Sequence, residues 1–143
     1  MMEYDGIMRA LCWYQPFGSL MLHGKIETRE WNKKFHVRGK FLIYTSKKPF
    51  IGTQEWLDKY NVNEVLKDEP TKDLNGYAIA VADLVHYRKM LPEDEKKCFV
   101  DFSSIRKCLI FENVRRIEPF EWNFGSQGIS FVPESEKLKI KYI

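Results

Sequence analysis

The stretch GYAIAVADLVHY, residues 76–87, constrains the fold of this 143-residue chain more than any other part of the sequence. Alternate side chains of a strand point to opposite faces. One face of this stretch would carry large side chains and one acid, namely Tyr77, Ile79, Val81, Asp83 and Val85. The other face would be nearly all small over its first half, with Ala78, Ala80 and Ala82. An alanine face leaves room for an element that packs very close, such as a helix or the far wall of a small barrel. The sequence therefore predicts one long, buried strand.

Further apolar stretches bounded by turn residues predict shorter strands on either side of this one. They cover residues 7–14, 25–31, 39–46, 129–133 and 137–143, together with a stretch from Lys107 that ends at Pro119. Helices are predicted after Pro16, which suits a first helical turn, after Thr53, a good N-cap, and within residues 91–99. There is no regular β-α-β alternation. The pattern predicts an α+β fold, a small and mostly antiparallel β-barrel of about six strands with two or three short helices.

Composition limits the class of protein. Hydrophobic residues make up 44% of the chain and aromatic residues 15%, enough for a core without disulfides. We expect one domain over residues 1–143, with 137–143 as an extra terminal strand. No run approaches the ~20 apolar residues that span a bilayer. The three cysteines lack metal-binding spacing, so we expect reduced thiols in a cytoplasmic protein, with Cys98 the most accessible. His23 and His36 have no third ligand at a sensible spacing, so no metal site and no cofactor are predicted.

Charge is unevenly distributed along the chain. Between Lys25 and Lys48 there are eight basic and two acidic residues, a net charge of +6. From Pro49 to Asn75 there are six acids against three lysines, a net charge of −3. Such asymmetry indicates either a basic face that attracts phosphates or an ordinary solvated surface on which lysines fall in one segment.

The segment GKIETREW, residues 24–31, concentrates ionisable groups just after the first predicted helix. Gly24 is suited to end that helix because glycine accepts the left-handed conformation common at a helix C-terminus. If the chain then runs extended, Lys25, Glu27, Arg29 and Trp31 share one face, and Thr28 points to the other. The pattern predicts a polar strip that lines one side of a strand.

These residues resemble an ASCH domain, a member of the PUA-like superfamily. The resemblance is carried by LCWYQPFGSLMLHGKIETREW and VRGKFLIYTSKK, followed by NGYAIAVADLVHY and CLIFENVRRIEPFEW…GSQGISFVP. It covers most of residues 10–133, and the ordered set of motifs is more specific than any single one. One departure is that only Ile26 separates Lys25 from Glu27, where the family usually has two residues.

The resemblance implies a PUA-like barrel that binds RNA or a modified nucleoside, with no membrane partner, in a basic cleft. The implied binding residues are Gln15, Lys25, Glu27, Arg29, Trp31, Lys33, Lys34 and Arg38. Lysine and arginine can hold phosphate, and a carboxylate can accept a hydrogen bond from the exocyclic amine of cytosine. An internal Glu27–Arg29 salt bridge that only orders the strand is the structural alternative. The oligomeric state stays open.

Two enzymatic alternatives follow from branches of the same family. Some small ASCH proteins resemble amidohydrolases that remove the acyl group of N4-acylcytidine with a lysine, a threonine and an acid. The matching residues are Lys25 and Thr28, with Glu27 or Asp83 as the acid. Others are ribonucleases, which need a basic cleft and one general base. A protein-interaction module whose basic face meets an acidic partner is a further alternative.

Overall fold

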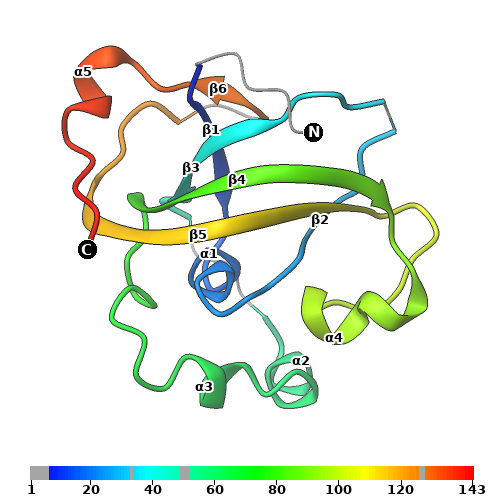
Figure 1. Cartoon of the computed structure of the whole chain (residues 1–143). Helices are drawn as coiled ribbons and strands as arrows, with labels where there is room; N and C mark the ends of the chain where they lie inside the picture. Colours follow the sequence, from blue (N-terminus) through cyan, green and yellow to red (C-terminus); the bar gives the residue numbers. More distant parts are fainter. Residues whose placement is uncertain (1–6, 33, 49–51, 126–127) are drawn as a thin grey trace.

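The computed structural model describes residues 7–32, 34–48, 52–125 and 128–143, and these form one curled sheet with short helices packed around it (Figure 1). The strands are β1 (Arg9–Trp13), β2 (Glu27–Arg29), β3 (Gly39–Thr45), β4 (Tyr77–Lys89), β5 (Lys107–Glu121) and β6 (Ser130–Phe131). The helices are α1 (Phe17–Met21), α2 (Gln54–Lys59), α3 (Val62–Val65), α4 (Glu95–Cys98) and α5 (Glu134–Lys137), with a 3₁₀ turn η1 (Pro92–Asp94) before α4.

The sheet has the strand order β2-β5-β4-β3-β1-β6. Only the β1–β3 pair is parallel; every other neighbouring pair is antiparallel. The predicted α+β class with a mostly antiparallel, barrel-like sheet of six strands is confirmed, the sheet being curled into a half-barrel. The helices outnumber the two or three that were predicted, because α3 and α5 are single four-residue turns that leave almost no periodic pattern in the sequence.

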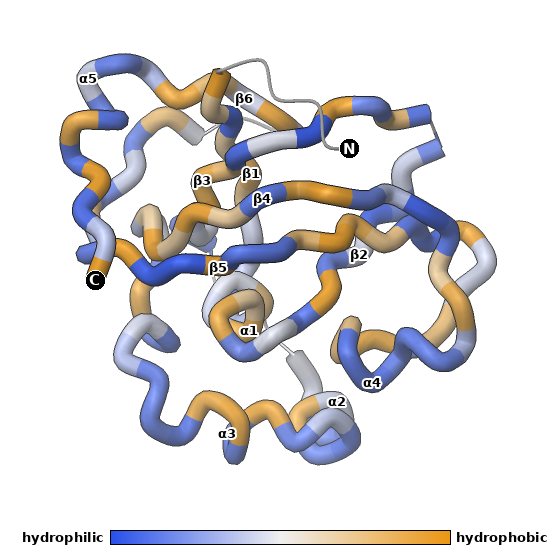
Figure 2. Tube along the Cα trace, in the orientation of Figure 1, coloured by the Kyte–Doolittle hydropathy of each residue, from blue (hydrophilic) through white to orange (hydrophobic). Residues whose placement is uncertain are grey.

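Both faces of the sheet are covered, so most residues of β3 and of the first half of β4 are buried and hydrophobic (Figure 2). Phe41 and Ile43 of β3 belong to one core cluster, and Leu42 and Tyr44 belong to the other. The alanines of β4 are completely buried, as the sequence predicts, but they do not share one face. A register shift between Ala78 and Ala80 places Ala78 in the second cluster, and Ala80 and Ala82 in the first.

The first core cluster holds the elements that position the candidate site. Trp13 at the end of β1 and Met21 at the end of α1 pack in this cluster with Ala80 and Ala82. Helix α1 itself contacts β1 and β3. Gly24, with φ of +86°, turns the chain after α1, and Ile26 N donates a backbone hydrogen bond of 2.9 Å to Lys97 O. The chain then enters β2 beside β5.

Two predicted elements at the C-terminal end differ from the structure. Strand β5 continues past Pro119 to Glu121, because Pro119 falls in the irregular stretch between the Ala78–Phe120 and Ala80–Arg116 pairs. The extra strand predicted over 137–143 is reduced to one bridge, between Tyr142 and Ile117. A helical turn, α5, forms instead at its start, where Lys137 and Lys139 reach glutamates three residues earlier.

The three cysteines are free thiols. Cys98 is fully buried, which corrects the expectation that it is the accessible one. It faces inward from α4 onto Met90 and Cys108, and its Sγ lies 4.0 Å from Cys108 Sγ. Among the described residues, none of the helices has the length and apolar character needed to cross a membrane.

The loop between α3 and β4 is held by the buried carboxylate of Glu69. Arg116 donates two hydrogen bonds to it, one of 2.8 Å from Nη1 to Oε2 and one from Nη2 to Oε1. Thr71 donates from its backbone N and from Oγ1, and His23 Nε2 lies 2.7 Å from Oε1. Burial alone raises the pKa of Glu69, but these partners outweigh it and hold the pKa at about 2, against 4.5 ordinarily. The carboxylate thus links the loop to β5 and to the end of α1.

We expect Glu69→Gln to lower the free energy of unfolding at pH 7 by roughly 1.5 to 3 kcal/mol, because charged hydrogen bonds are lost. The folded pKa lies below the unfolded one, so this contribution is complete above about pH 4.5 and is lost as the pH falls toward 2. Urea denaturation at pH 7, 5 and 3 should show the gap between wild type and variant closing at the lowest pH. An equal difference in unfolding free energy between wild type and variant at all three pH values would contradict this account.

Candidate functional site

A cleft of about 900 Å³ opens where the end of β1, the exit of α1, strand β2 and the segments beside β3 and β5 meet. Its charged lining residues are Lys25, Glu27, Arg29, Lys47, Lys48 and Arg106. Its aromatic lining residues are Trp13, Tyr14, Phe17, Tyr44 and Trp122. Thr28 also lines it. The cleft therefore contains five cationic side chains and one carboxylate, and a negatively charged ligand would be attracted to it.

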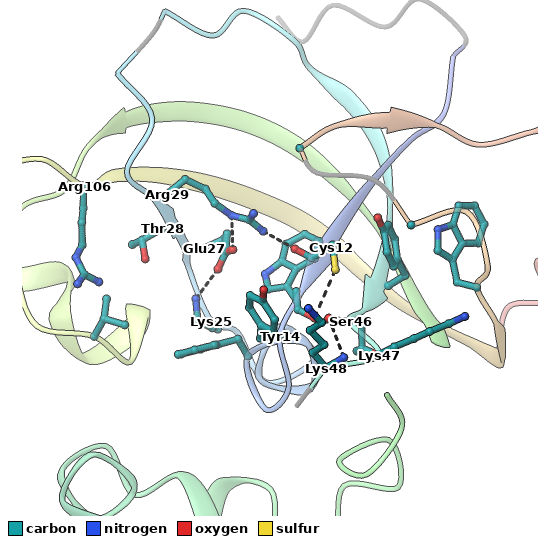
Figure 3. Close-up of a pocket in the computed structure, with 18 of the residues that line it drawn as sticks. Cys12, Tyr14, Lys25, Glu27, Thr28, Arg29, Ser46, Lys47, Lys48 and Arg106 are labelled. Carbon is teal, nitrogen blue, oxygen red and sulfur yellow. Dashed lines mark hydrogen bonds and ion pairs between the residues drawn. The ribbon is translucent and has the colours of Figure 1, made fainter. Parts of the chain in front are cut away.

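The floor of the cleft is a chain of three ionised side chains (Figure 3). Lys25 Nζ donates a 2.7 Å hydrogen bond to Glu27 Oε1, and Arg29 Nε donates one of 2.7 Å to Glu27 Oε2. Each carboxylate oxygen thus accepts from one cation. The geometry follows from the extended backbone after Gly24, which places alternate side chains on one side.

Burial makes this chain of charges rigid. Only 5% of Lys25 and 6% of Glu27 is exposed. Burial raises the pKa of Glu27, but the charges of Lys25 and Arg29 and their hydrogen bonds outweigh it and hold the pKa below its ordinary range. The carboxylate stays ionised at neutral pH, which makes it a hydrogen-bond acceptor and a weak base.

Arg29 connects the floor to the neighbouring elements. Its Nη2 donates a 2.7 Å hydrogen bond to Cys12 O at the end of β1. Its guanidinium lies 5.4 Å from the ring centroid of Trp13 and 5.9 Å from that of Trp31, within cation–π range. The side chain is therefore held in place before any ligand arrives.

Three donors on cleft-lining residues have no hydrogen-bond partner in the described part of the chain. They are the indole nitrogens of Trp13 and Trp122 and Nε of Arg106. A buried donor without a partner costs about 1 to 3 kcal/mol. Because each of these atoms is itself buried, none of them is exposed to a ligand in the cleft.

Lys25, Glu27 and Arg29 come together as the sequence predicts, and the shortened Lys25-to-Glu27 spacing still leaves Lys25 in the cleft. Thr28 lies on the other side of the β2 trace from Glu27, toward Arg106, as the alternation predicts (Figure 3). The cleft extends past both sides of this short strand, so Thr28 lines it as well.

The structure places five other candidate residues elsewhere, and two of them, Asp83 and Gln15, line neither concave surface. Asp83 is on β4, 3.5 Å from Lys40 Nζ and hydrogen-bonded to Asn113, and it lines no part of the cleft. Gln15 is buried; its side chain accepts from Ser19 N and donates to three oxygens, including Thr71 O at 2.9 Å. Those bonds give it a structural role, joining α1 to the loop before β4.

The remaining candidates flank a second concave surface beside the cleft. Trp31, Lys34 and Arg38 line this surface and not the cleft. Trp31 leaves the predicted strip because β2 ends at Arg29, and its ring packs edge-on against Phe35 at a centroid distance of 5.2 Å. Lys33 lies outside the described residues.

Sequence reasoning did not identify Arg106, Tyr44 or Trp122 as cleft residues. Arg106 immediately precedes β5, and β5 pairs with β2 so that Lys107 lies opposite Arg29. This pairing joins segments nearly 80 residues apart. The sequence does show a basic residue just before a predicted strand. That position indicates a cleft residue only when the partner of the strand is known.

Comparisons with known proteins identify the fold. None of the protein-family models matches the sequence, and none of the curated proteins does. Crystal structures of an ASCH protein from Zymomonas mobilis share the fold over nearly the whole chain. The native protein is 13% identical with a TM-score of 0.54, covering 94% of each chain. A serine-to-alanine mutant is 13% identical with a TM-score of 0.57 and the same coverage. A tyrosine-to-phenylalanine mutant is 11% identical with a TM-score of 0.57, covering 92% of this chain and 94% of that one. The chain therefore has the fold of these ASCH structures, as the sequence predicted.

The Lys25–Glu27–Arg29 network predicts an order of stability among variants. Glu27→Gln leaves two neighbouring cations without their shared carboxylate, and we expect it to cost about 3 kcal/mol of unfolding free energy. Lys25→Met leaves Glu27 paired with Arg29, so it should cost less. Lys59→Met, which breaks an exposed pair with Asp101, is the control and should leave stability unchanged. Urea denaturation at pH 7 measures all three; a larger loss for Lys25→Met than for Glu27→Gln would refute the central role of Glu27.

Proposed function

We propose that this protein binds single-stranded RNA or a nucleotide-like ligand in the cleft over Lys25, Glu27 and Arg29. The observation that carries the proposal is a cleft whose described lining has five cations and one buried carboxylate, Glu27, with two of the cations bonded to it. A ligand that offers both phosphate and an amine donor matches this mixture of charges. Nucleotides with cytosine or adenine have both groups.

The ammonium group of Lys25 and the carboxylate of Glu27 can each form a further hydrogen bond to the ligand. An ammonium group has three donors, and Lys25 uses two of them, toward Glu27 Oε1 and Ile26 O. The third donor is left for phosphate. A carboxylate has about four acceptor positions, and Glu27 accepts one bond at each oxygen from the two cations, so it can accept another from an exocyclic amine.

The rim of the cleft offers a surface for base stacking. Tyr14 lines the cleft and is 52% exposed. Stacking of a base on an aromatic ring contributes roughly 1 to 3 kcal/mol and tolerates any base. Trp13 is almost fully buried, so its ring serves the core and supports Arg29.

The shape of the site favours a ligand over a protein partner. Small-molecule pockets usually occupy about 300 to 1,000 Å³ and place a few polar groups among apolar walls. The cleft volume of about 900 Å³ and its convergent charged floor are of this kind. The resemblance of the sequence motifs to ASCH domains also implies nucleic acid as the class of partner.

Fluorescence anisotropy with a labelled eight-nucleotide RNA tests the proposal. Arg29→Ala should weaken binding about 10- to 100-fold, because it removes a charged donor from the floor. Arg106→Ala, which touches neither Glu27 nor Lys25, should also weaken binding. The slope of log K against log salt concentration should become shallower by about 0.7. Lys67→Ala, an exposed lysine outside the cleft, is the matched control. Equal affinity at low salt in wild type, Arg29→Ala and Arg106→Ala would refute the proposal.

A second candidate function is hydrolysis of N4-acylcytidine, and the position of Thr28 in the cleft favours it. In this reaction the Thr28 hydroxyl, or a water, attacks the acyl carbon and passes its proton to Glu27. Lys25 stabilises the oxyanion, the C–N4 bond breaks, and N4 takes the proton as cytidine leaves. Water then releases the acid. Asp83 of β4 pairs with Lys40 of β3 and does not line the cleft, so it has no part in this scheme.

The ultraviolet absorbance of N4-acetylcytidine incubated with the protein tests this second function. Wild type should convert the spectrum toward that of cytidine, and Lys25→Ala should abolish the change. Thr28→Val should abolish it as well, whereas Thr28→Ser, which keeps the hydroxyl, should retain it. A flat trace from folded wild type, or an unchanged rate in Lys25→Ala, would eliminate the hydrolase.

A further inference from the structure

A second concave surface of about 920 Å³ lies beside the cleft, and we call it the basic groove. Its cationic lining residues are Lys34, Arg38, Arg88, Lys89 and Lys107, and Glu30 is the single acidic residue among its described lining residues. Nothing in the proposed function so far uses this surface.

The groove and the cleft are adjacent at two points of the chain. On β2 and just after it, Arg29 lines the cleft and Trp31 lines the groove, and the Arg29 guanidinium lies 5.9 Å from the Trp31 ring centroid. At the start of β5, Arg106 lines the cleft and Lys107 lines the groove. A chain-like ligand that leaves the cleft beside Arg29 and Arg106 therefore enters the groove at once.

The sheet register concentrates like charges at this boundary. Lys107 of β5 lies opposite Arg29 of β2 on one side and opposite Lys89 of β4 on the other. Three cationic residues thus stand in one row across three neighbouring strands. Like charges directly opposite each other destabilise a sheet. A row of this kind is expected where an anionic ligand neutralises it.

The lysines of the groove are not neutralised by the protein. Within the described residues, no hydrogen bond or ion pair engages the Nζ atoms of Lys34, Lys89 and Lys107. The two arginines differ: Arg88 is paired with Asp94 at 2.7 Å, and Arg38 donates to the carbonyl of Val37 at 2.8 Å. The three lysines therefore supply the uncompensated charge.

We propose that the basic groove binds the phosphodiester backbone of an RNA strand whose terminal or flipped nucleotide occupies the cleft. This inference rests on the proposed function and narrows it, since the ligand is then an oligonucleotide and not a free nucleoside. Lysines act as point charges that track phosphates without reading sequence. The floor of the cleft selects the nucleotide, and the groove adds affinity that depends on strand length and on salt.

The test compares cytidine 5′-monophosphate with an eight-nucleotide single-stranded RNA in wild type and in a triple variant, Lys34→Ala, Lys89→Ala and Lys107→Ala. Wild type should bind the RNA at least roughly tenfold more tightly than the mononucleotide at low salt. The triple variant should lose most of that advantage, and the dependence of log K on log salt should become shallower by about 2. Its affinity for the mononucleotide should be unchanged.

A control variant has the same change in net charge at exposed lysines that line neither cavity, Lys67→Ala, Lys72→Ala and Lys141→Ala. It should bind the RNA nearly as wild type does. If the mononucleotide binds but the RNA binds no more tightly, or if both triple variants weaken RNA binding equally, the groove proposal is wrong and the proposed function stands. If wild type binds neither ligand, both are wrong. Competition by poly-glutamate as effective as that by RNA would assign the groove to an acidic protein and overturn the proposal.

Discussion

The carboxylate of Glu27, buried between Lys25 and Arg29, is the interaction on which the candidate site depends. An isolated buried carboxylate is costly, and two cations with good geometry compensate it. Through Arg29 the same network reaches the backbone of β1 at Cys12. Lys25, just before β2, and Arg29, at its end, hold the Glu27 carboxylate between them and so form the floor of the cleft. One ion-pair chain therefore orders the floor and presents its charges to a ligand.

Beside this floor the sheet register brings three cationic residues into one row. The pairing of β2 with β5 and of β5 with β4 aligns Arg29, Lys107 and Lys89. The cleft on one side of this row is compact and partly aromatic, and the groove on the other side is open and lysine-rich. The first is suited to one nucleotide, and the second is suited to a backbone of repeated phosphates.

Local patterns predicted much of this arrangement. Gly24 and the alternation after it were sufficient to predict a polar strip just after a helix, and the ordered motifs were sufficient to predict the fold. The alanines of β4 were expected to share one face, and they do not. The failures came from long-range pairing. Asp83 is remote from the cleft and Arg106 is part of it because of the β2–β5–β4 register, which no local pattern encodes. Gln15, whose partner Thr71 is 56 residues away, is structural for the same reason.

The four tryptophans allow one direct measurement of the central claim, because they report on three different places. Trp13 and Trp122 line the cleft and Trp31 lines the groove. Trp56 lines neither, and its indole N–H donates to Phe99 O. We would record the indole N–H signals by heteronuclear NMR during titration with cytidine 5′-monophosphate. The account predicts that the Trp13 and Trp122 signals shift together and saturate, while that of Trp56 stays fixed. No shift at Trp13 and Trp122, or a shift at Trp56 alone, would contradict it.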